Sequence, residues 1–137
     1  MQVSEIMHKG VTTVQIDASL KHVASLMKKE DIGSIPVYKN DRPVGFVTDR
    51  DIVISCVAHG TSPEKPVSRA MRNEIFCIHE NQDISDAVKL MKDKQISRLL
   101  VVDEGERPVG MLSLQDLSEN TNNDGLKADI LTKIKKN

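Results

Sequence analysis

Two short stretches of the chain place a hydroxyl side chain three residues before a carboxylate, directly after an apolar run. They are Gly45-Phe46-Val47-Thr48-Asp49-Arg50-Asp51 and Gly110-Met111-Leu112-Ser113-Leu114-Gln115-Asp116, and we call them the first and the second corner. Each is typical of a strand that ends at the hydroxyl residue and turns into a helix. Free N–H groups at the start of a helix bind anions, and the hydroxyl adds a donor. A carboxylate one turn further on can accept hydrogen bonds from a vicinal diol, so the pattern suits a ribonucleotide.

The same side chains also have a purely structural interpretation. Thr48 and Ser113 are good N-cap residues, and the carboxylates of Asp51 and Asp116 stabilise the first turn of a helix. Taken alone, the corners favour this structural interpretation. The choice between a cap and a binding site therefore depends on the elements that surround the corners.

The whole chain repeats itself, which explains why the corner occurs twice. Met7 aligns with Met71, and Leu26-Met27-Lys28 aligns with Leu90-Met91-Lys92. After one extra residue in the second copy, Arg42-Pro43-Val44-Gly45 aligns with Arg107-Pro108-Val109-Gly110. Such self-similarity at a fixed period indicates an internal duplication.

Each copy is expected to contain a short lead-in helix, a strand, a helix, a two-stranded hairpin and a second helix. In the first copy these are residues 3–8 with Ser4 as N-cap, 12–16, a helix capped by Asp17 or Ser19 that ends near Glu30, 34–38, 44–48 and 49–59. In the second copy they include residues 67–71, 75–79, a helix capped by Asp83, and a helix from Leu114 to about Glu119. Asn40-Asp41 and Glu104-Gly105 are typical of hairpin turns.

The apolar spacing predicts which helix faces are buried. Leu20, Val23, Ala24 and Met27 share one helical face in the first copy, as do Ile84, Ala87, Val88 and Met91 in the second. A right-handed crossover then joins two parallel strands, and the hairpin adds a third, antiparallel strand. One such unit of about 60 residues buries little surface by itself, so its twin is expected to cover the free sheet face.

The predicted fold class is therefore α+β, with tandem βαββα repeats whose two three-stranded sheets pack around a pseudo-two-fold axis. The repeats are expected at residues 1–60 and 61–121, with a turn-rich linker at 60–66. Residues 122–137 form a separate polar loop and a short amphipathic helix through Leu126, Ile130, Leu131 and Ile134. Both repeats make one module.

Composition excludes several classes of partner. The chain has 137 residues, with 19 Lys and Arg against 20 Asp and Glu. This balance argues against nucleic acid or an anionic membrane, since both attract a surplus of cations. Aromatic residues are limited to Phe46, Phe76 and Tyr38, so stacking of bases on aromatic platforms is also disfavoured. No apolar run reaches the length of a membrane span and no secretory signal is evident, which indicates a cytoplasmic protein.

Metal binding and catalysis find little support in the sequence. Cys56 precedes His59 by three residues and Cys77 precedes His79 by two, but neither pair resembles a four-ligand zinc set. Two cysteines are also too few for a disulfide framework. No nucleophile elbow and no Gly-rich phosphate loop is present. We expect neither a metal site nor an enzyme.

Further motifs surround the corners: Ile6-Met7 in the lead-in, Leu26-Met27 at the end of the helix, and Ile32-Gly33-Ser34-Ile35-Pro36-Val37 in the next strand. Together with the duplicated corner, this set resembles paired CBS domains, the modules named after cystathionine β-synthase. The resemblance covers nearly all of residues 3 to 120. The string from Gly45 to Ile54 is similar to small stand-alone bacterial CBS-pair proteins, including the hypoxic response type.

The resemblance implies that clefts between the repeats bind AMP, ATP, NAD or S-adenosylmethionine. In the family the hydroxyl residue contacts phosphate, the aspartate takes the ribose hydroxyls, and backbone from two strands frames the base. One site would use Thr12, Ile35, Pro36, Thr48 and Asp51, and the other Phe76, Arg98, Leu99, Ser113 and Asp116. Arg98 could reach a phosphate, whereas the first copy has Ser34 there. Asp49 and Glu80 are expected to add negative charge near the phosphate positions.

The leading hypothesis is a regulatory module that senses an adenosine-type nucleotide and acts on a separate effector protein, with no cofactor required. The alternative is a protein-interaction or dimerisation scaffold whose clefts are vestigial. The resemblance also implies a homodimer formed through the apolar faces of the helices.

Overall fold

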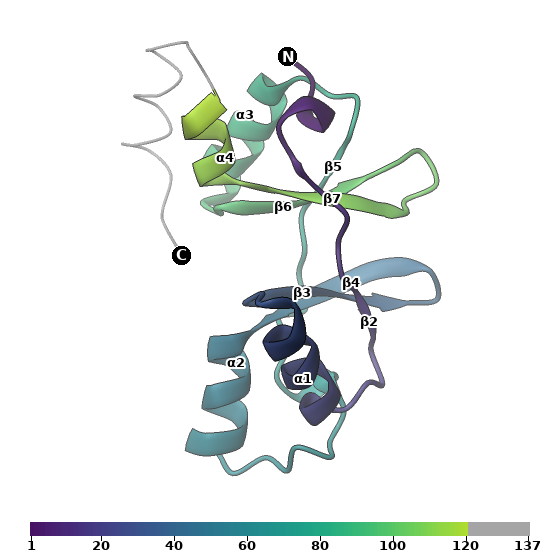
Figure 1. Cartoon of the computed structure of the whole chain (residues 1–137), viewed down its shortest axis with the longest axis vertical. Coiled ribbons are helices and arrows are strands. Elements are labelled where there is room, and N and C mark those ends of the chain that lie inside the picture. The colour runs from purple at the N-terminus through teal and green to yellow at the C-terminus, as the bar shows by residue number, and fades with distance from the viewer. Residues whose placement is uncertain (121–137) are drawn as a thin grey trace. The chain divides into compact units, whose positions relative to one another are not determined.

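A computed structural model describes residues 1–120 of the chain (Figure 1). The C-terminal helix expected within residues 122–137 lies outside this described part. Within residues 1–120, none of the helices has the length and apolar character needed to cross a membrane. Within these residues two compact units are present, one formed by Thr12–Ile75 and the other by Met1–Val11 together with residues 76–120.

The unit of Thr12–Ile75 holds the first corner. Its three-stranded sheet has the order β2-β3-β4, in which β2 is parallel to β3 and β3 is antiparallel to β4. Its elements are β2 (Val14–Gln15), α1 (Leu20–Glu30), β3 (Ser34–Lys39), β4 (Arg42–Thr48), α2 (Asp49–Val53), the π-helical turn η2 (Ile54–Ala58) and the 3₁₀ turn η3 (Val67–Arg69).

The other unit holds the second corner and has a four-stranded sheet of order β1-β7-β6-β5. Its elements are the 3₁₀ turn η1 (Val3–Glu5), β1 (His8–Lys9), β5 (Cys77–His79), α3 (Ile84–Lys94), β6 (Arg98–Val102), β7 (Pro108–Ser113) and α4 (Leu114–Asn120). Strands β5, β6 and β7 repeat the parallel and antiparallel pairings of the other sheet. The predicted α+β repeat of βαββα is therefore confirmed.

The compact units do not follow the boundaries of the sequence repeats. The lead-in before the first copy, residues 1–11, packs with the second copy, and the lead-in before the second copy lies within the unit of the first. The segment 3–8 was expected to be helical, but only Val3–Glu5 is, and its N-cap is Gln2 rather than Ser4. His8 and Lys9 instead pair with Met111 and Gly110 of β7, which adds the fourth strand that the sequence did not predict.

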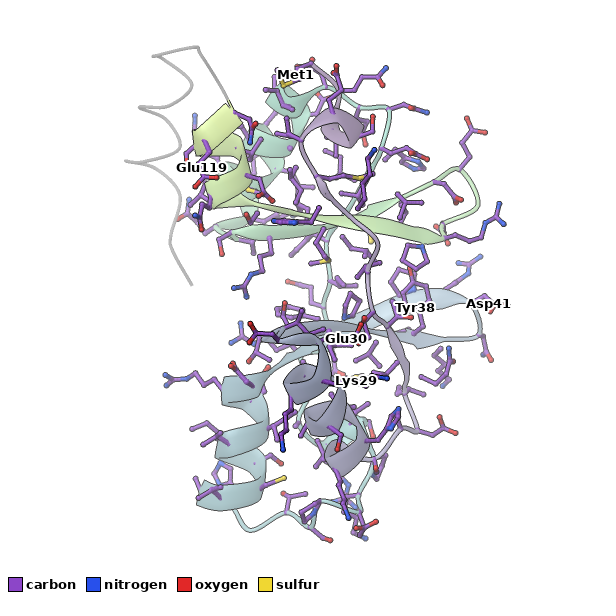
Figure 2. The ribbon with its side chains drawn as sticks, in the orientation of Figure 1. Met1, Lys29, Glu30, Tyr38, Asp41 and Glu119 are labelled. Atoms are coloured by element: carbon purple, nitrogen blue, oxygen red, sulfur yellow. The ribbon has the colours of Figure 1, made fainter. Side chains whose placement is uncertain are left out.

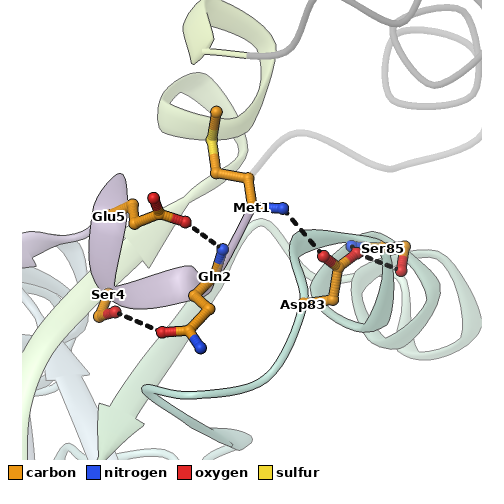
Figure 3. A network of polar contacts seen from close by, with 6 residues as sticks. All are labelled: Met1, Gln2, Ser4, Glu5, Asp83 and Ser85. Carbon is orange, nitrogen blue, oxygen red and sulfur yellow. Dashed lines mark hydrogen bonds and ion pairs between the residues drawn. The ribbon is translucent and has the colours of Figure 1, made fainter.

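Helix ends follow the capping chemistry expected from the sequence. The Ser19 hydroxyl accepts the His22 amide at the start of α1, and Asp83 caps α3 by accepting the Ser85 amide. Asp83 also accepts the Ser85 hydroxyl and pairs with the amino group of Met1 at 3.1 Å (Figure 3). These contacts, the Ser85 hydroxyl first, lower the pKa of Asp83 to about 2.

Each unit has its own core on the helix side of its sheet. The predicted stripes are confirmed at Leu20, Val23 and Met27 and at Ile84, Ala87, Val88 and Met91, all of them buried, whereas Ala24 of the first stripe is half-buried. They pack on alternate strand residues, such as Ile35, Val37 and Val47 in one unit and Leu99, Val101 and Leu112 in the other. The residues between these, including both corner hydroxyls, consequently project to the opposite face of their sheet.

The two hairpins differ at their turns. Asn40 and Asp41 both have positive φ, as a two-residue type I′ turn requires, and Figure 2 shows Asp41 at the tip. In the second hairpin the left-handed residue is Glu106, not Glu104 or Gly105. There the Asp103 carboxylate accepts the amides of Gly105 and Arg107, so a side chain closes the longer loop.

Candidate functional site

Both corners form the same reciprocal capping box. The Thr48 hydroxyl accepts the Asp51 amide at 3.1 Å, and the Asp51 carboxylate accepts the Thr48 amide at 2.9 Å. Ser113 and Asp116 make the same two bonds, also at 3.1 and 2.9 Å. The structural interpretation of these residues is thus correct, but it uses only one oxygen of each carboxylate. The hydroxyl proton and the second carboxylate oxygen keep capacity for a ligand.

A basic side chain from a lead-in faces that second oxygen in each unit. Arg72 Nε lies 3.6 Å from Asp51 Oδ1, and its guanidinium stands 5.4 Å from the centre of the Phe46 ring. His8 Nε2 lies 3.5 Å from Asp116 Oδ1. His8 and Arg72 follow the aligned Met7 and Met71, so they are equivalent positions of the duplication.

The sequence did not predict that these two basic residues belong to the site. His8 was expected at the end of the lead-in helix of residues 3–8, but it is an exposed residue of strand β1. The alignment of the repeats could have shown that His8 and Arg72 are equivalent. It could not have shown their partners, because each lead-in contacts the corner of the other sequence copy.

The glycine that opens each corner allows the lead-in backbone to approach. A Cβ atom on Gly45 would overlap the carbonyl oxygen of Arg72, and one on Gly110 would overlap that of His8. At the first corner this approach is fixed by two backbone hydrogen bonds, Phe46 N–H to Arg72 O at 3.1 Å and Arg72 N–H to Phe46 O at 2.8 Å. Glycine is required here for close packing, not for its turn geometry.

The other residues expected at the first site lie in the same unit as Thr48 and Asp51. Ser34 is the cross-strand partner of Thr48, and Pro36 is that of Phe46 on the same sheet face. Ile35 is fully buried with its side chain in the core, so only its backbone is available to a ligand. Thr12 donates its hydroxyl to Glu30 at 2.8 Å, near the end of α1.

The second set is likewise within one unit. Arg98 is exposed and is the cross-strand partner of Ser113. Leu99 is 1% exposed and belongs to the core, and its side chain is not available to a ligand. Phe76 is half-buried, and the Lys94 ammonium lies 5.6 Å from its ring centre.

The two acidic residues expected near phosphate positions lie differently relative to their corners. Asp49 follows Thr48 directly, and its carboxylate lies against Gly33, 3.3 Å from where a Cβ would stand. Glu80, by contrast, donates its amide to Val102 at the end of β6 opposite to Arg98. The expectation for Glu80 is therefore wrong, because the parallel register of β5 and β6 carries it away from the corner.

Two further features of the described residues could indicate a site besides the corners: shifted pKa values and clusters of possible metal ligands. Burial, with a smaller contribution from Glu106, raises the pKa of the Cys77 thiol to about 11, and Cys77 lies in strand β5 as expected. Across residues 1–120 no three His, Cys, Asp or Glu side chains gather closely enough to hold a metal ion.

A family model described as the CBS domain matches the chain twice, at residues 3–57 and 67–121. CBS domain-containing protein YhcV of Bacillus subtilis is 36% identical over 132 residues, which cover 96% of this chain and 94% of YhcV. Hypoxic response protein 1 of Mycobacterium tuberculosis is 34% identical over 116 residues, which cover 83% of this chain and 80% of that protein. The matched region spans 61% of a longer protein of Methanopyrus kandleri, MK0525.

Solved structures give the same result. The crystal structure of Hypoxic Response Protein I, with two coordinated zinc ions, has a TM-score of 0.74 and 32% identity, covering 88% of this chain and 99% of its own. The CBS domain pair of protein MJ0100, in complex with 5′-methylthioadenosine and S-adenosyl-L-methionine, has a TM-score of 0.71 and 25% identity, covering 87% and 94%. The resemblance inferred from the sequence motifs is confirmed.

Proposed function

The chain belongs to the CBS domain family, as a tandem pair, and from this premise we propose that it is a regulatory module that binds an adenosine-type ligand at its corners. The observation that carries the proposal is the duplicated capping box, in which a hydroxyl and a carboxylate are held three residues apart with binding capacity left over. The position of the ligand between the repeats, which the family resemblance implies, stays a prediction.

The unused capacity of each corner matches the chemistry of a ribonucleoside. A carboxylate offers about four acceptor positions on its two oxygens. At Asp51 one is used by the Thr48 amide and one faces Arg72, which leaves room for the two hydroxyls of a ribose. Asp116 has the same arrangement with Ser113 and His8. The fixed backbone and the cap hold both carboxylates in place before a ligand arrives.

Candidate ligands are AMP, ATP, NAD and S-adenosylmethionine. The bound 5′-methylthioadenosine and S-adenosyl-L-methionine of the MJ0100 domain pair support the adenosine class. Binding would act by shifting the balance between two arrangements of the protein, which requires that the ligand prefers one of them. In this proposal the chain performs no reaction, and its output passes through a separate effector protein.

Isothermal titration calorimetry with these four compounds tests the proposal. Asp51→Ala and Asp116→Ala, measured separately, should each weaken binding at their own corner by about 1–3 kcal/mol if the carboxylate bonds the ribose. Asp86→Ala is the matched control, because Asp86 also stands at the third position of a helix, α3, and belongs to neither corner. No binding of any compound below millimolar concentration would refute the proposal for this ligand class.

A second candidate function, a dimerisation scaffold, is supported by an apolar surface on α2 and η2. Val53, Ile54 and Val57 are 55%, 41% and 78% exposed, unlike the buried apolar residues of the cores. We propose a second copy of this chain as the partner of this surface. Light scattering at micromolar concentration should give a dimer that Val57→Asp converts to a monomer. A monomeric wild-type protein would refute the scaffold.

The cytoplasmic location expected from the sequence also stays a prediction.

A further inference from the structure

The two corners share their capping box but differ at the residue that faces the hydroxyl across the hairpin. In the second corner Arg98 is paired with Ser113, whereas in the first Ser34 is paired with Thr48. Residues paired in this way have Cβ atoms about 4.5–5.5 Å apart and project from the same sheet face. The long side chain of Arg98 therefore stands close enough to contact a phosphate that accepts a hydrogen bond from the Ser113 hydroxyl.

Arg98 is also available for such a group. It is exposed, and within residues 1–120 its guanidinium is engaged in no ion pair. A guanidinium presents two parallel N–H donors that match the oxygens of a phosphate. Ser34 offers only a short, uncharged hydroxyl in the equivalent place.

The two corners also differ at the residue that follows the hydroxyl residue. In the first corner it is Asp49, whose exposed carboxylate lies against Gly33, next to Ser34. In the second corner it is Leu114, which is 7% exposed and packs in the core. The first corner therefore carries an exposed negative charge one residue after its hydroxyl, which the second corner lacks, and this charge disfavours a phosphate there.

Other charges near the corners do not reverse this difference. Arg72 and His8 face Asp51 and Asp116, at the carboxylate side of their corners. Arg50 follows Asp49 in the same helical turn and brings the net charge of the first corner toward that of the second. The two corners are consequently similar in net charge. They differ in the position of charge, because only the second corner has a cationic side chain, Arg98, across the hairpin from its hydroxyl.

We infer that the chain discriminates between its corners by phosphate: the second corner takes a phosphorylated adenosine, and the first takes an adenosine compound without a phosphate. The inference rests on the proposed function, because it assigns ligand classes to the same two sites. It predicts that one molecule can hold two different ligands at once.

Adenosine and AMP are the matched probes, because they differ only by the phosphate. Calorimetric titration of the wild-type protein should show AMP bound at the second corner, so Asp116→Asn should weaken AMP binding at least tenfold and Asp51→Asn should not. Arg98→Ser should weaken AMP binding at least tenfold while adenosine binding changes less than twofold. Arg98→Lys, which keeps the charge, should restore part of the loss.

Two further variants complete the design. Arg107→Ser removes an exposed arginine at the opposite end of the same hairpin, where it pairs with Asp103, and should leave AMP binding unchanged. Asp49→Leu copies the second corner onto the first and should raise AMP affinity there at least threefold, measured in an Asp116→Asn background.

The outcomes separate this inference from the proposed function. If adenosine and AMP both bind but Arg98→Ser weakens them equally, or if Asp51→Asn is the variant that loses AMP, phosphate discrimination is refuted while ligand binding stands. If neither probe binds the wild-type protein, the proposed function fails and the inference fails with it. A tenfold loss specific to AMP in Arg98→Ser supports both.

Discussion

Gly45→Ala is expected to destabilise the unit of Thr12–Ile75 strongly, although it adds a single methyl group. Gly45 is buried in β4, and the added Cβ would overlap the Arg72 carbonyl oxygen. That oxygen belongs to backbone and cannot rotate away as a side chain would. The lead-in must therefore move off β4, and the two hydrogen bonds between Phe46 and Arg72 must lengthen or break.

The size of the effect follows from three contributions. Two backbone hydrogen bonds contribute about 0.5–1.5 kcal/mol each to stability. Overpacking by one methyl group costs about 1–3 kcal/mol. Replacing glycine stiffens the unfolded chain, which returns about 0.4–1 kcal/mol. Together these contributions lower the free energy of unfolding by about 1–6 kcal/mol, with a central value of about 3 kcal/mol.

Urea denaturation followed by tyrosine fluorescence measures this loss in the correct unit. The chain has one tyrosine and no tryptophan, and Tyr38 lies buried in β3 beside β4. Gly105→Ala is the control, because a Cβ there meets Asp103 at an ordinary 3.5 Å. It should change the free energy of unfolding by less than about 0.5 kcal/mol. If Gly45→Ala costs under about 1 kcal/mol, the close approach of the lead-in is not what requires glycine.

Three other predictions concern side chains outside the corners. Contacts led by the Ser85 hydroxyl lower the pKa of Asp83 to about 2, so its ionised carboxylate stabilises the folded protein above about pH 4. This stabilisation is lost as the pH falls toward 2, and the Asp83→Asn variant should not show that loss in an acid unfolding curve. In a Cys56→Ser variant, the raised pKa of Cys77, about 11 against 9.0, should slow its reaction with a thiol reagent at pH 8 roughly 100-fold relative to the unfolded protein. Ser19→Ala removes the N-cap of α1 and should lower the free energy of unfolding by about 0.5–2 kcal/mol, which urea denaturation will detect.

The elements predicted correctly are those whose patterns are local. The apolar stripe of Leu20 and Val23 lies within α1, and the cap at Asp83 lies at the start of α3. Each pattern involves a single helix, so the spacing of residues suffices to identify it. Asn40-Asp41 likewise determines its own turn. Strand β1 was missed because His8 and Lys9 are exposed and too few to show alternation. Their conformation is imposed by pairing with the edge of β7, which no local pattern records.

The site residues were predicted only in part for the same physical reason. The hydroxyl and carboxylate of each corner lie on one helical turn, so the sequence predicts their contact, and the structure confirms it at Thr48 and Asp51. Arg72 was missed because it reaches Asp51 through tertiary packing. Glu80 was misplaced because its position depends on the register of two strands, which composition does not determine.

The exchange of lead-ins makes each corner depend on both sequence repeats. A fragment that ends at residue 60 would lack Val67, which is fully buried in the first core, and Arg72, which faces Asp51. A fragment that begins at residue 61 would lack Val3, fully buried in the other core, and His8, which faces Asp116. Neither repeat of the sequence is therefore a complete structural unit. Cutting the chain between the repeats removes a core residue and the basic side chain beside the carboxylate from both corners, so we expect the binding proposed for either corner to require the intact pair.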